Sequence, residues 1–107
     1  MILNKKTDTI PKTAIYIGRP TKWGNPFVMT KEEERNNVCD KYIIFIMEKK
    51  NKYLREEARK ELKDKDLVCY CSPKRCHGDI LQKIAHSKND EELFDFWQPI
   101  LKKEHYK

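Results

Sequence analysis

Three cysteines and one histidine lie within nine residues of sequence, in the segment CYCSPKRCH at positions 69–77. The thiolate of Cys76 is a nucleophile, and the adjacent His77 could serve as its base or as an imidazolium partner. The same segment offers Zn²⁺ a legitimate ligand set of three thiolates and an imidazole, from Cys69, Cys71, Cys76 and His77. These residue types indicate either nucleophilic chemistry or a metal site.

The spacing of the first two cysteines argues against the metal site without excluding it. Residues two apart in an extended strand lie about 6.6 Å apart along the strand, whereas two sulfurs on one tetrahedral zinc approach to roughly 3.8 Å. Cys69 and Cys71 could therefore share a zinc only if the strand end curls. Free cysteine is among the most buried residue types, so we expect both to be small core residues, with zinc as the alternative.

The residues around Cys76 predict the N-terminus of a helix. Apolar side chains recur as one stripe in residues 80–85, so a helix should begin near Cys76. The positive end of its dipole favours a phosphate, Gly78 lets the phosphate come close, and Lys74 and Arg75 lie alongside. The same field would lower the pKa of Cys76. The candidate catalytic residues are Cys76, His77 and Asp79.

A second unusual segment, GRPTKWGNP, occupies positions 18–26. Its two glycines and two prolines predict a loop that holds one shape. Arg19 could bind an anion bidentately, Lys22 could add a point charge, and Trp23 offers a flat face for a base or sugar. The candidate ligand-binding residues are Gly18, Arg19, Lys22, Trp23 and Asn25 in this loop, and Lys74, Arg75 and Gly78 in the later segment.

Both segments also have a purely structural interpretation. Residues 18–26 could form an ordinary rigid turn in which Trp23 fills the core. His77 could simply hydrogen-bond at the helix start, and Asp79 suits the first turn of a helix electrostatically, which requires no catalysis. The residues alone leave the structural and the functional interpretation open.

Short predicted strands position the two segments. Residues 1–3, 14–17 and 66–71 combine apolar, β-prone side chains with turn residues at their ends. The connection between the second and third strands is long enough for a helical crossover, so these strands should be parallel neighbours. In open α/β sheets, ligands bind beyond the carboxyl ends of the strands, where residues 18–26 and 72–77 begin. We therefore expect the two segments to meet.

Helices are predicted between and after the strands. A capping box from Thr30 to Glu33 starts the first helix, which should include the apolar run 42–47, although that run alone could equally be a strand. Residues 54–62 have apolar side chains at four-residue spacing and predict a second amphipathic helix. A third helix follows Cys76, and a last one contains a proline that should kink or end it.

These elements predict one domain over residues 1–107. A chain of this length buries roughly 60–65% of its unfolded surface, enough for a single core. The fold class is α/β, Rossmann-like, with two or three layers: a short, mainly parallel sheet of two or three strands flanked by about four helices. The last helix, at about 90–103, is an addition to this pattern.

Composition points to an anionic partner. The chain has a net charge of +6, and residues 1–30 contain five Lys or Arg side chains against one Asp. No apolar run approaches the roughly 20 residues that cross a bilayer, and the first residues are too polar for a signal peptide. We therefore expect a soluble cytoplasmic protein without a membrane partner, in the host cytoplasm if viral, whose cysteines are free or metal-bound.

Taken together, YIGRPTKWGNPF at 16–27 and LVCYCSPKRCHGDIL at 67–81 resemble the bacterial and viral family numbered 4326 among the domains of unknown function. The order of the motifs, their spacing and the helical region between them agree, so the resemblance covers residues 1–86. It implies no particular activity. The residues that it carries over are Gly18, Arg19, Trp23, Gly24, Asn25 and Pro26 in the loop, and Cys69, Cys71, Pro73, Cys76, His77, Gly78 and Asp79 in the second motif.

Two functions are compatible with these observations. In the first, the domain binds a phosphorylated small molecule, a nucleotide or nucleotide sugar, and acts on it through Cys76 and His77 if it is an enzyme. In the second, it is a non-enzymatic nucleic-acid-binding or protein-interaction module that uses the basic N-terminal loop, with the cysteines as core residues or zinc ligands. Nucleic-acid binding that falls steeply with salt and survives loss of Cys76 would favour the second.

Overall fold

The computed structural model describes residues 2–6, 8–70 and 74–105 of the chain. Its strands are β1 (Ile2–Asn4), β2 (Ile15–Tyr16) and β3 (Leu67–Cys69). They form a parallel sheet in the order β1-β3-β2, in which Leu3 and Tyr16 lie opposite Val68 from its two sides. The predicted parallel pairing of the second and third strands is confirmed, and β1 completes the sheet on the other edge of β3.

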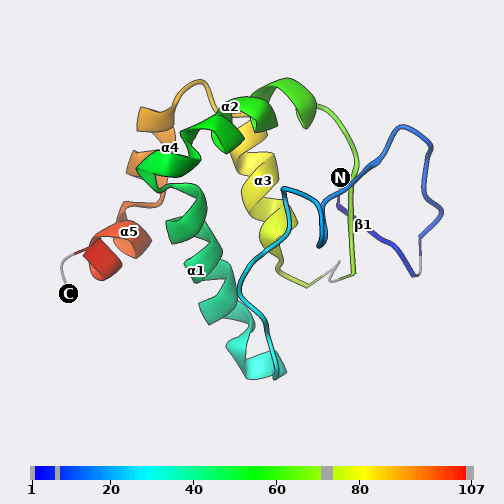
Figure 1. Ribbon diagram of the computed structural model, residues 1–107, viewed down its shortest axis with the longest axis horizontal. Coiled ribbons are helices and arrows are strands. Elements are labelled where there is room, and N and C mark those ends of the chain that lie inside the picture. The colour runs from blue at the N-terminus through cyan, green and yellow to red at the C-terminus, as the bar shows by residue number, and fades with distance from the viewer. Residues whose placement is uncertain (1, 7, 71–73, 106–107) are drawn as a thin grey trace.

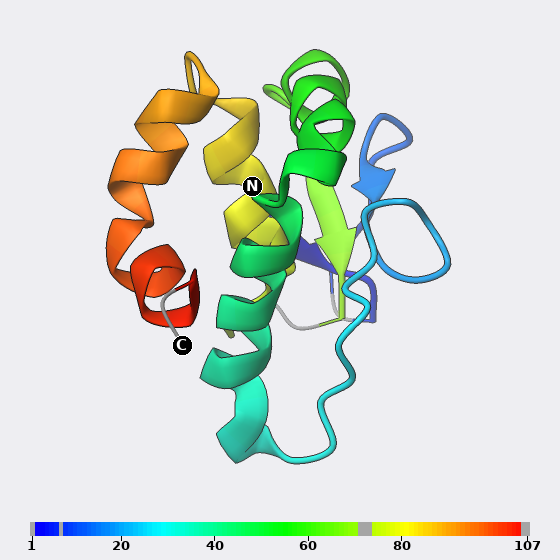
Figure 2. The same cartoon turned by 60° about the vertical axis from the view of Figure 1, so that its left-hand side comes forward.

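The helices lie on one side of this sheet (Figures 1 and 2). They are the 3-10 helices η1 (Glu32–Glu34) and η2 (Lys49–Asn51) and the α-helices α1 (Arg35–Ile46), α2 (Lys52–Glu61), α3 (His77–Ala85), α4 (Asp90–Phe96) and α5 (Gln98–His105). In Figure 2, α1, α2 and α3 lie next to the sheet, and α4 and α5 lie beyond them. The chain is a small α/β domain, as predicted. None of the helices in the described ranges is long and apolar enough to cross a membrane.

The first helix begins where the sequence predicts, but with a different carboxylate at its start. The Thr30 amide and hydroxyl donate to Oε1 of Glu34 at 2.8 and 2.7 Å, whereas the capping box predicted Glu33 in this position. A 3-10 turn, with about three residues per turn, precedes α1 and changes which side chain faces the cap. The apolar run 42–47 belongs to α1 through Ile46 and is not a strand.

The C-terminal helix is two helices. Helix α4 ends with its C-cap residue Trp97, whose amide donates to the Leu93 carbonyl at 2.9 Å, and α5 begins at the next residue. Pro99 therefore lies in the first turn of α5, where its missing N–H costs no intrahelical hydrogen bond. The prediction that Pro99 interrupts this helix is confirmed, and α5 packs against α1.

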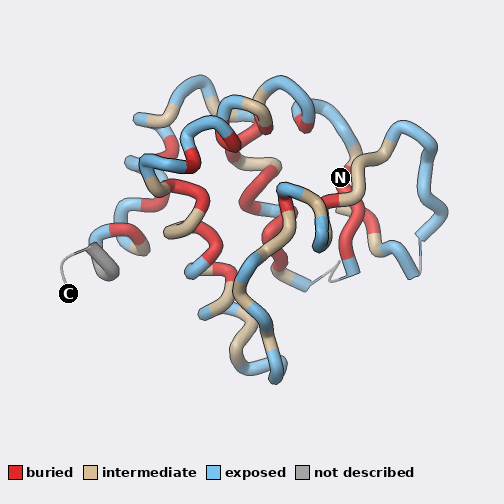
Figure 3. The backbone as a smooth tube through the Cα atoms, in the orientation of Figure 1, coloured by how far each residue is buried: buried red, intermediate tan, exposed pale blue. Residues whose placement is uncertain are grey.

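The central strand β3 is buried on both faces. Leu67 and Cys69 belong to the core that the helices cover, and Val68 points to the other face, as alternation along a strand requires. Figure 3 shows buried residues along β3 and the inner sides of the helices, whereas residues 8–13 are exposed. The largest fully buried side chains include Ile17, Tyr42, Ile43, Ile46, Leu62, Leu67, Leu81, Ile84 and Leu93. This packing fixes β3 and α3, the two elements that flank the cysteine motif.

Candidate ligand-binding site

A cavity of about 410 Å³ lies at the carboxyl ends of β2 and β3. Its volume falls within the usual range for small-molecule sites, about 300–1,000 Å³. The lining residues are Tyr16, Gly18, Arg19, Asn25, Phe27, Met29, Arg35, Val38, Cys39, Cys69, Tyr70, Arg75, Cys76 and His77. Residues of the 18–26 loop and of the cysteine motif are both present, so the predicted meeting of the two segments is confirmed.

The cavity wall is basic. Three arginines line it, and none of its described lining residues is Asp or Glu. Arg19 is exposed, and within the described part of the chain its guanidinium has neither a hydrogen-bond nor an ion-pair partner. Its five donors in a planar fork match a phosphate or carboxylate bidentately. Arg19 is therefore the lining residue whose charge is available to a ligand.

The other two lining arginines are held by neighbouring groups. Nη1 of Arg35 donates to the Arg75 carbonyl at 2.9 Å, and the Arg35 guanidinium also pairs with Glu32. Nη2 of Arg75 pairs with Asp40 at 3.1 Å. Hydrogen bonds from Arg35 and then Lys74 lower the pKa of Glu32 to about 2, so this carboxylate stays charged at neutral pH. These contacts position Arg35 and Arg75 and balance their charges from outside the cavity.

The 18–26 loop is held in one shape by internal contacts. The Thr21 hydroxyl donates to the Gly18 carbonyl at 2.6 Å, and the Gly24 amide donates to the Thr21 carbonyl at 3.0 Å. A Cβ on Gly24 would lie 3.0 Å from both N and Cα of Arg19, so only glycine allows the two backbones to approach this closely. The loop thus presents Arg19 on a compact turn, as the glycines and prolines predict.

A buried tyrosine joins this loop to the helices. The Tyr42 hydroxyl donates to the Trp23 carbonyl at 2.9 Å, and burial raises the pKa of Tyr42 well above its ordinary value. Tyr42 therefore stays neutral and keeps its donor proton. The hydrogen bond joins the loop to α1.

Aromatic rings form a further part of the wall. Tyr16 and Tyr70 make an edge contact with ring centroids 6.2 Å apart, and Phe27 lines the cavity separately. Lys5 Nζ lies 4.4 Å from the Tyr16 ring centroid. Sequence reasoning assigned these rings and Arg35 no part in ligand binding. Tyr16 and Tyr70 could have been found from their places at the strand ends, whereas only the docking of α1 brings Arg35 to the cavity.

The thiol of Cys76 lies at the start of α3, as predicted. Its Sγ accepts a hydrogen bond from the Gly78 amide at 3.3 Å and lies 3.3 Å from Sγ of Cys69. Nε2 of His77 is 2.7 Å from the Ile17 carbonyl. Because a carbonyl only accepts, Nε2 must carry a proton, and His77 thereby joins α3 to the end of β2.

The N-terminus of α3 differs from the predicted phosphate site. The Cys76 amide donates to Asp79 Oδ2 at 3.2 Å, and the Asp79 amide donates to the Cys76 carbonyl at 3.1 Å. The Gly78 amide is bound to the Cys76 thiol, so these three donors already have partners. Asp79 acts as the capping carboxylate, the structural role that its position in the first turn allowed. The three amides that the sequence predicted as phosphate donors are therefore engaged by groups of the protein itself.

Gly78 and Trp23 pack in the interior and do not line the cavity. A Cβ on Gly78 would lie 2.9 Å from Cδ1 of both Ile2 and Ile17, so the missing side chain brings α3 close to the sheet. Trp23 is 3% exposed and belongs to the core, because its large apolar surface gains most from burial. The predicted close approach of phosphate at Gly78 and the predicted stacking on Trp23 are therefore not the roles that these positions favour.

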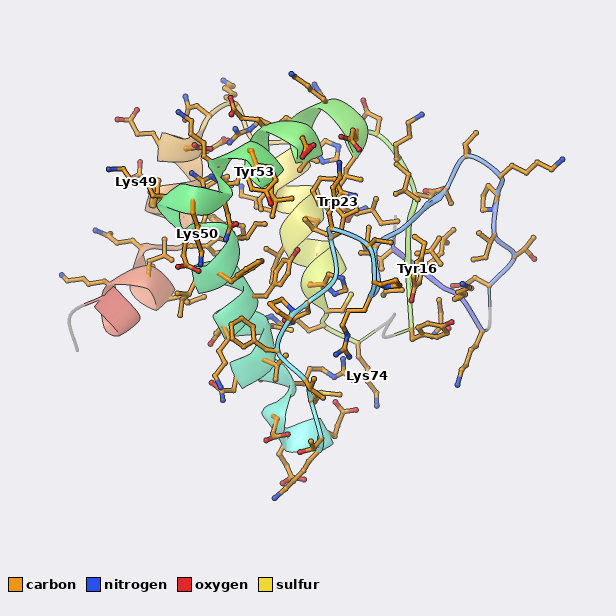
Figure 4. All side chains as sticks on the ribbon, viewed as in Figure 1. Tyr16, Trp23, Lys49, Lys50, Tyr53 and Lys74 are labelled. Atoms are coloured by element: carbon orange, nitrogen blue, oxygen red, sulfur yellow. The ribbon has the colours of Figure 1, made fainter. Side chains whose placement is uncertain are left out.

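The two predicted lysines also lie outside the cavity lining. Nζ of Lys22 pairs with Glu57 and Glu61 at 3.1 and 2.9 Å, and the hydrogen bond with Glu61 is the main cause that raises the pKa of Lys22. Lys74 pairs with Glu32 at 2.7 Å. Carboxylates on α2 thus hold the amine of Lys22, and a carboxylate on η1 holds that of Lys74. Figure 4 labels Lys74 and also shows Lys49, Lys50 and Tyr53 on the other side of the view from Tyr16.

The described residues do not include the whole ligand set of the alternative zinc site. Within residues 2–6, 8–70 and 74–105, no group of three or more His, Cys, Asp or Glu side chains is arranged to hold a metal ion. Cys69 and Cys76 are close to one another, and Nε2 of His77 is engaged by a carbonyl. Cys71 and Pro73, which the sequence analysis also named, lie outside the described residues.

Comparison with known proteins identifies the family. No curated protein and no solved structure matches the chain. The family model described as Domain of unknown function (DUF4326) matches residues 2–87, which include both motifs, the whole sheet and the cavity lining. Helices α4 and α5 follow the matched region. The chain therefore belongs to the DUF4326 family, as its two motifs indicated.

Proposed function

We propose that this domain binds a phosphorylated small molecule of the nucleotide class in the cavity between the 18–26 loop and the cysteine motif. The observation that carries the proposal is the Arg19 guanidinium, which has no partner within the described residues and belongs to a wall with no described carboxylate. Charge-assisted bidentate hydrogen bonds are the strong contacts that fix a phosphate. Arg35 and Arg75 line the same cavity, but Glu32 and Asp40 balance their charges.

The aromatic rings of the wall support the nucleotide class over inorganic phosphate alone. Tyr16, Phe27 and Tyr70 line the same cavity as the three arginines. Stacking of a base on an aromatic ring contributes about 1–3 kcal/mol and tolerates any base. We therefore expect the phosphate to lie at Arg19 and the base or sugar to lie against the rings.

The proposal is tested by calorimetric titration of the full chain with inorganic phosphate, the four common nucleoside monophosphates and the corresponding nucleosides. A nucleotide should bind, the nucleoside should bind at least tenfold more weakly, and Arg19→Ala should remove most of this preference. Lys50→Ala is the matched control, because Lys50 is exposed and lies away from Tyr16 in Figure 4. Equal affinity for nucleotide and nucleoside would contradict the proposal.

Catalysis by the Cys-His motif can be assessed in the same samples. Cys76 and His77 both line the cavity, so a bound molecule would contact the thiol and the imidazole. Mass spectrometry of ligands incubated with the protein would reveal conversion. Conversion that is lost in Cys76→Ser while binding is retained would make Cys76 the nucleophile, whereas unchanged ligands would limit the function to binding.

Single-stranded nucleic acid is a second candidate ligand. Lys5 and Lys6 lie near the rings of Tyr16 and Tyr70, with Nζ to centroid distances of 4.4 Å for Lys5 and Tyr16 and 5.8 Å for Lys6 and Tyr70. Basic and aromatic side chains in this combination are typical of surfaces that bind single strands. Oligonucleotide affinity that falls steeply with salt and decreases in Lys5→Ala would favour this candidate, and no binding at low salt would exclude it.

A further inference from the structure

Two thiols on the cavity wall are close enough to react with one another. Sγ of Cys69 lies 3.3 Å from Sγ of Cys76, and no disulfide joins these two residues in the structure. A disulfide bond is about 2.05 Å long, so roughly 1.2 Å of sulfur movement would join them. Side-chain rotation or a small backbone adjustment can supply such a movement.

The two thiols occupy different electrostatic positions. Cys69 ends the central strand β3, whereas Cys76 caps the N-terminus of α3 and accepts the Gly78 amide. A hydrogen bond from an amide and the positive end of a helix stabilise a thiolate. Cys76 is therefore the better nucleophile. Cys69 lies close enough to attack an oxidised Cys76 sulfur and form a disulfide.

The access route limits the oxidant. Cys69 and Cys76 are 1% and 2% exposed, yet both line the cavity, so a reagent reaches them through that opening. A small hydroperoxide fits this route better than a peptide disulfide. We propose that Cys69 and Cys76 form a redox-active dithiol that reduces a small hydroperoxide, a function beyond ligand binding that does not depend on the proposed nucleotide.

The reaction balances in two steps. The Cys76 thiolate attacks the outer oxygen of the hydroperoxide, the O–O bond breaks, and Cys76 becomes a sulfenic acid while hydroxide or alkoxide leaves and is protonated. The Cys69 thiolate then attacks the Cys76 sulfur, which forms the S–S bond and releases the second oxygen as water. The dithiol loses two electrons and two protons, and the hydroperoxide becomes water and water or an alcohol.

The test treats the reduced full chain with hydrogen peroxide, alkylates the remaining thiols and maps the cysteines by mass spectrometry. We expect a disulfide between Cys69 and Cys76, loss of two of the four alkylatable thiols and full recovery after dithiothreitol. A disulfide that joins either residue to Cys39 or Cys71, or irreversible oxidation without any disulfide, would overturn the proposal. This measurement needs no variant, so a folding defect cannot obscure it.

Variants show which of the two thiols reacts first with the hydroperoxide. In Cys69→Ser, the oxidised Cys76 has no resolving thiol, so a sulfenic acid that reacts with dimedone should accumulate at Cys76. In Cys76→Ser, oxidation at Cys69 should be slowed at least tenfold, because its thiol lacks the helix N-terminus. Cys39→Ser should retain the disulfide between Cys69 and Cys76. Equal dimedone labelling of Cys69 and Cys76 in the two serine variants would contradict the assignment.

Discussion

The arginines of the α2–α4 contact and Arg19 at the cavity differ in what balances their charge. Arg55 and Arg59 on α2 both pair with Asp90 at the start of α4, at 3.1 and 2.7 Å. Arg55 is 3% exposed and also donates to the Ile46 and Glu48 carbonyls. Arg19, at the cavity, is exposed and has no such partner among the described residues. An arginine with internal partners holds the fold together, whereas one without them is available to a ligand.

The pKa of Asp90 reflects both its burial and its pairing with Arg55 and Arg59. Desolvation raises its pKa, but hydrogen bonds and charge from Arg55 and Arg59 outweigh this effect, so the pKa lies below the ordinary value. The cavity wall has no described carboxylate that could play this part. No carboxylate among the described residues pairs with Arg19, which is why we connect Arg19 with the proposed binding and the α2–α4 contact with stability.

The largest effect is expected at the α2–α4 contact. Arg55→Ala leaves the buried Ile46 carbonyl, the part-buried Glu48 carbonyl and one oxygen of Asp90 without this donor. We expect a loss of about 3 kcal/mol of the free energy of unfolding, the lower end for a buried pair, because Arg59 still pairs with Asp90. Urea unfolding followed by circular dichroism measures this loss. Lys50→Ala, at an exposed position on η2, should stay within about 0.5 kcal/mol of the wild type. A loss below about 1 kcal/mol in Arg55→Ala would contradict the structural role that we assign to Arg55.

At the cavity, we expect a large effect on ligand affinity and a small effect on stability. Arg19→Ala should lower nucleotide affinity at least tenfold, consistent with about 1.5–3 kcal/mol for hydrogen bonds to a charged group, and should change the free energy of unfolding by less than about 0.5 kcal/mol. Calorimetric titration and urea unfolding of the same preparation give both values. If Arg19→Ala were as unstable as Arg55→Ala, Arg19 would be a structural residue and the distinction would fail.

A smaller effect is expected where the loop meets α1. Tyr42→Phe keeps the buried ring but leaves the Trp23 carbonyl without its donor, which should cost about 1–2 kcal/mol of stability. Because the raised pKa keeps Tyr42 neutral, the difference between wild type and Tyr42→Phe should not change between pH 6 and pH 9. A difference that disappears at the upper end of this range would show that Tyr42 ionises, contrary to its burial.

The smallest effect is the acid dependence of stability. The folded-state pKa of Asp90 is lowered, so its contribution is fully present above the unfolded-state pKa and is lost as the pH falls through the folded-state pKa. Asp90→Asn should remove this part of the pH dependence, so its difference from wild type should shrink toward acid pH. Urea midpoints measured from pH 6 downward provide the comparison, and a difference that grows on acidification would contradict the sign.

Much of the fold could be predicted because its signals are local. The capping signal at residues 30–34, the four-residue spacing in α2 and the apolar stripe of α3 each predict a helix within one short stretch of sequence. The parallel pairing of β2 and β3 followed from the long crossover between them. Since parallel strands place their carboxyl ends at one edge, the meeting of the two motifs was predictable from the same argument.

The roles of individual side chains were less predictable because their partners lie far away in sequence. Lys22 pairs with residues 35 and 39 positions later, and no local pattern indicates that these carboxylates would take its charge. Trp23 could have faced either the core or the cavity. Arg35 reaches the cavity through the docking of α1 onto the sheet, and the 3.3 Å approach of Cys69 to Cys76 depends on how α3 packs against β3.

The central claim is that a phosphorylated ligand lies in the cavity with its phosphate at Arg19. Amide chemical-shift mapping of the ¹⁵N-labelled full chain during titration with a nucleoside monophosphate tests it most directly. We predict shifts concentrated at residues 16–27 and 69–77, with those of the loop lost in Arg19→Ala and retained in Lys50→Ala. Shifts centred on the α2–α4 contact, or a loop that responds equally with and without the Arg19 side chain, would contradict the account.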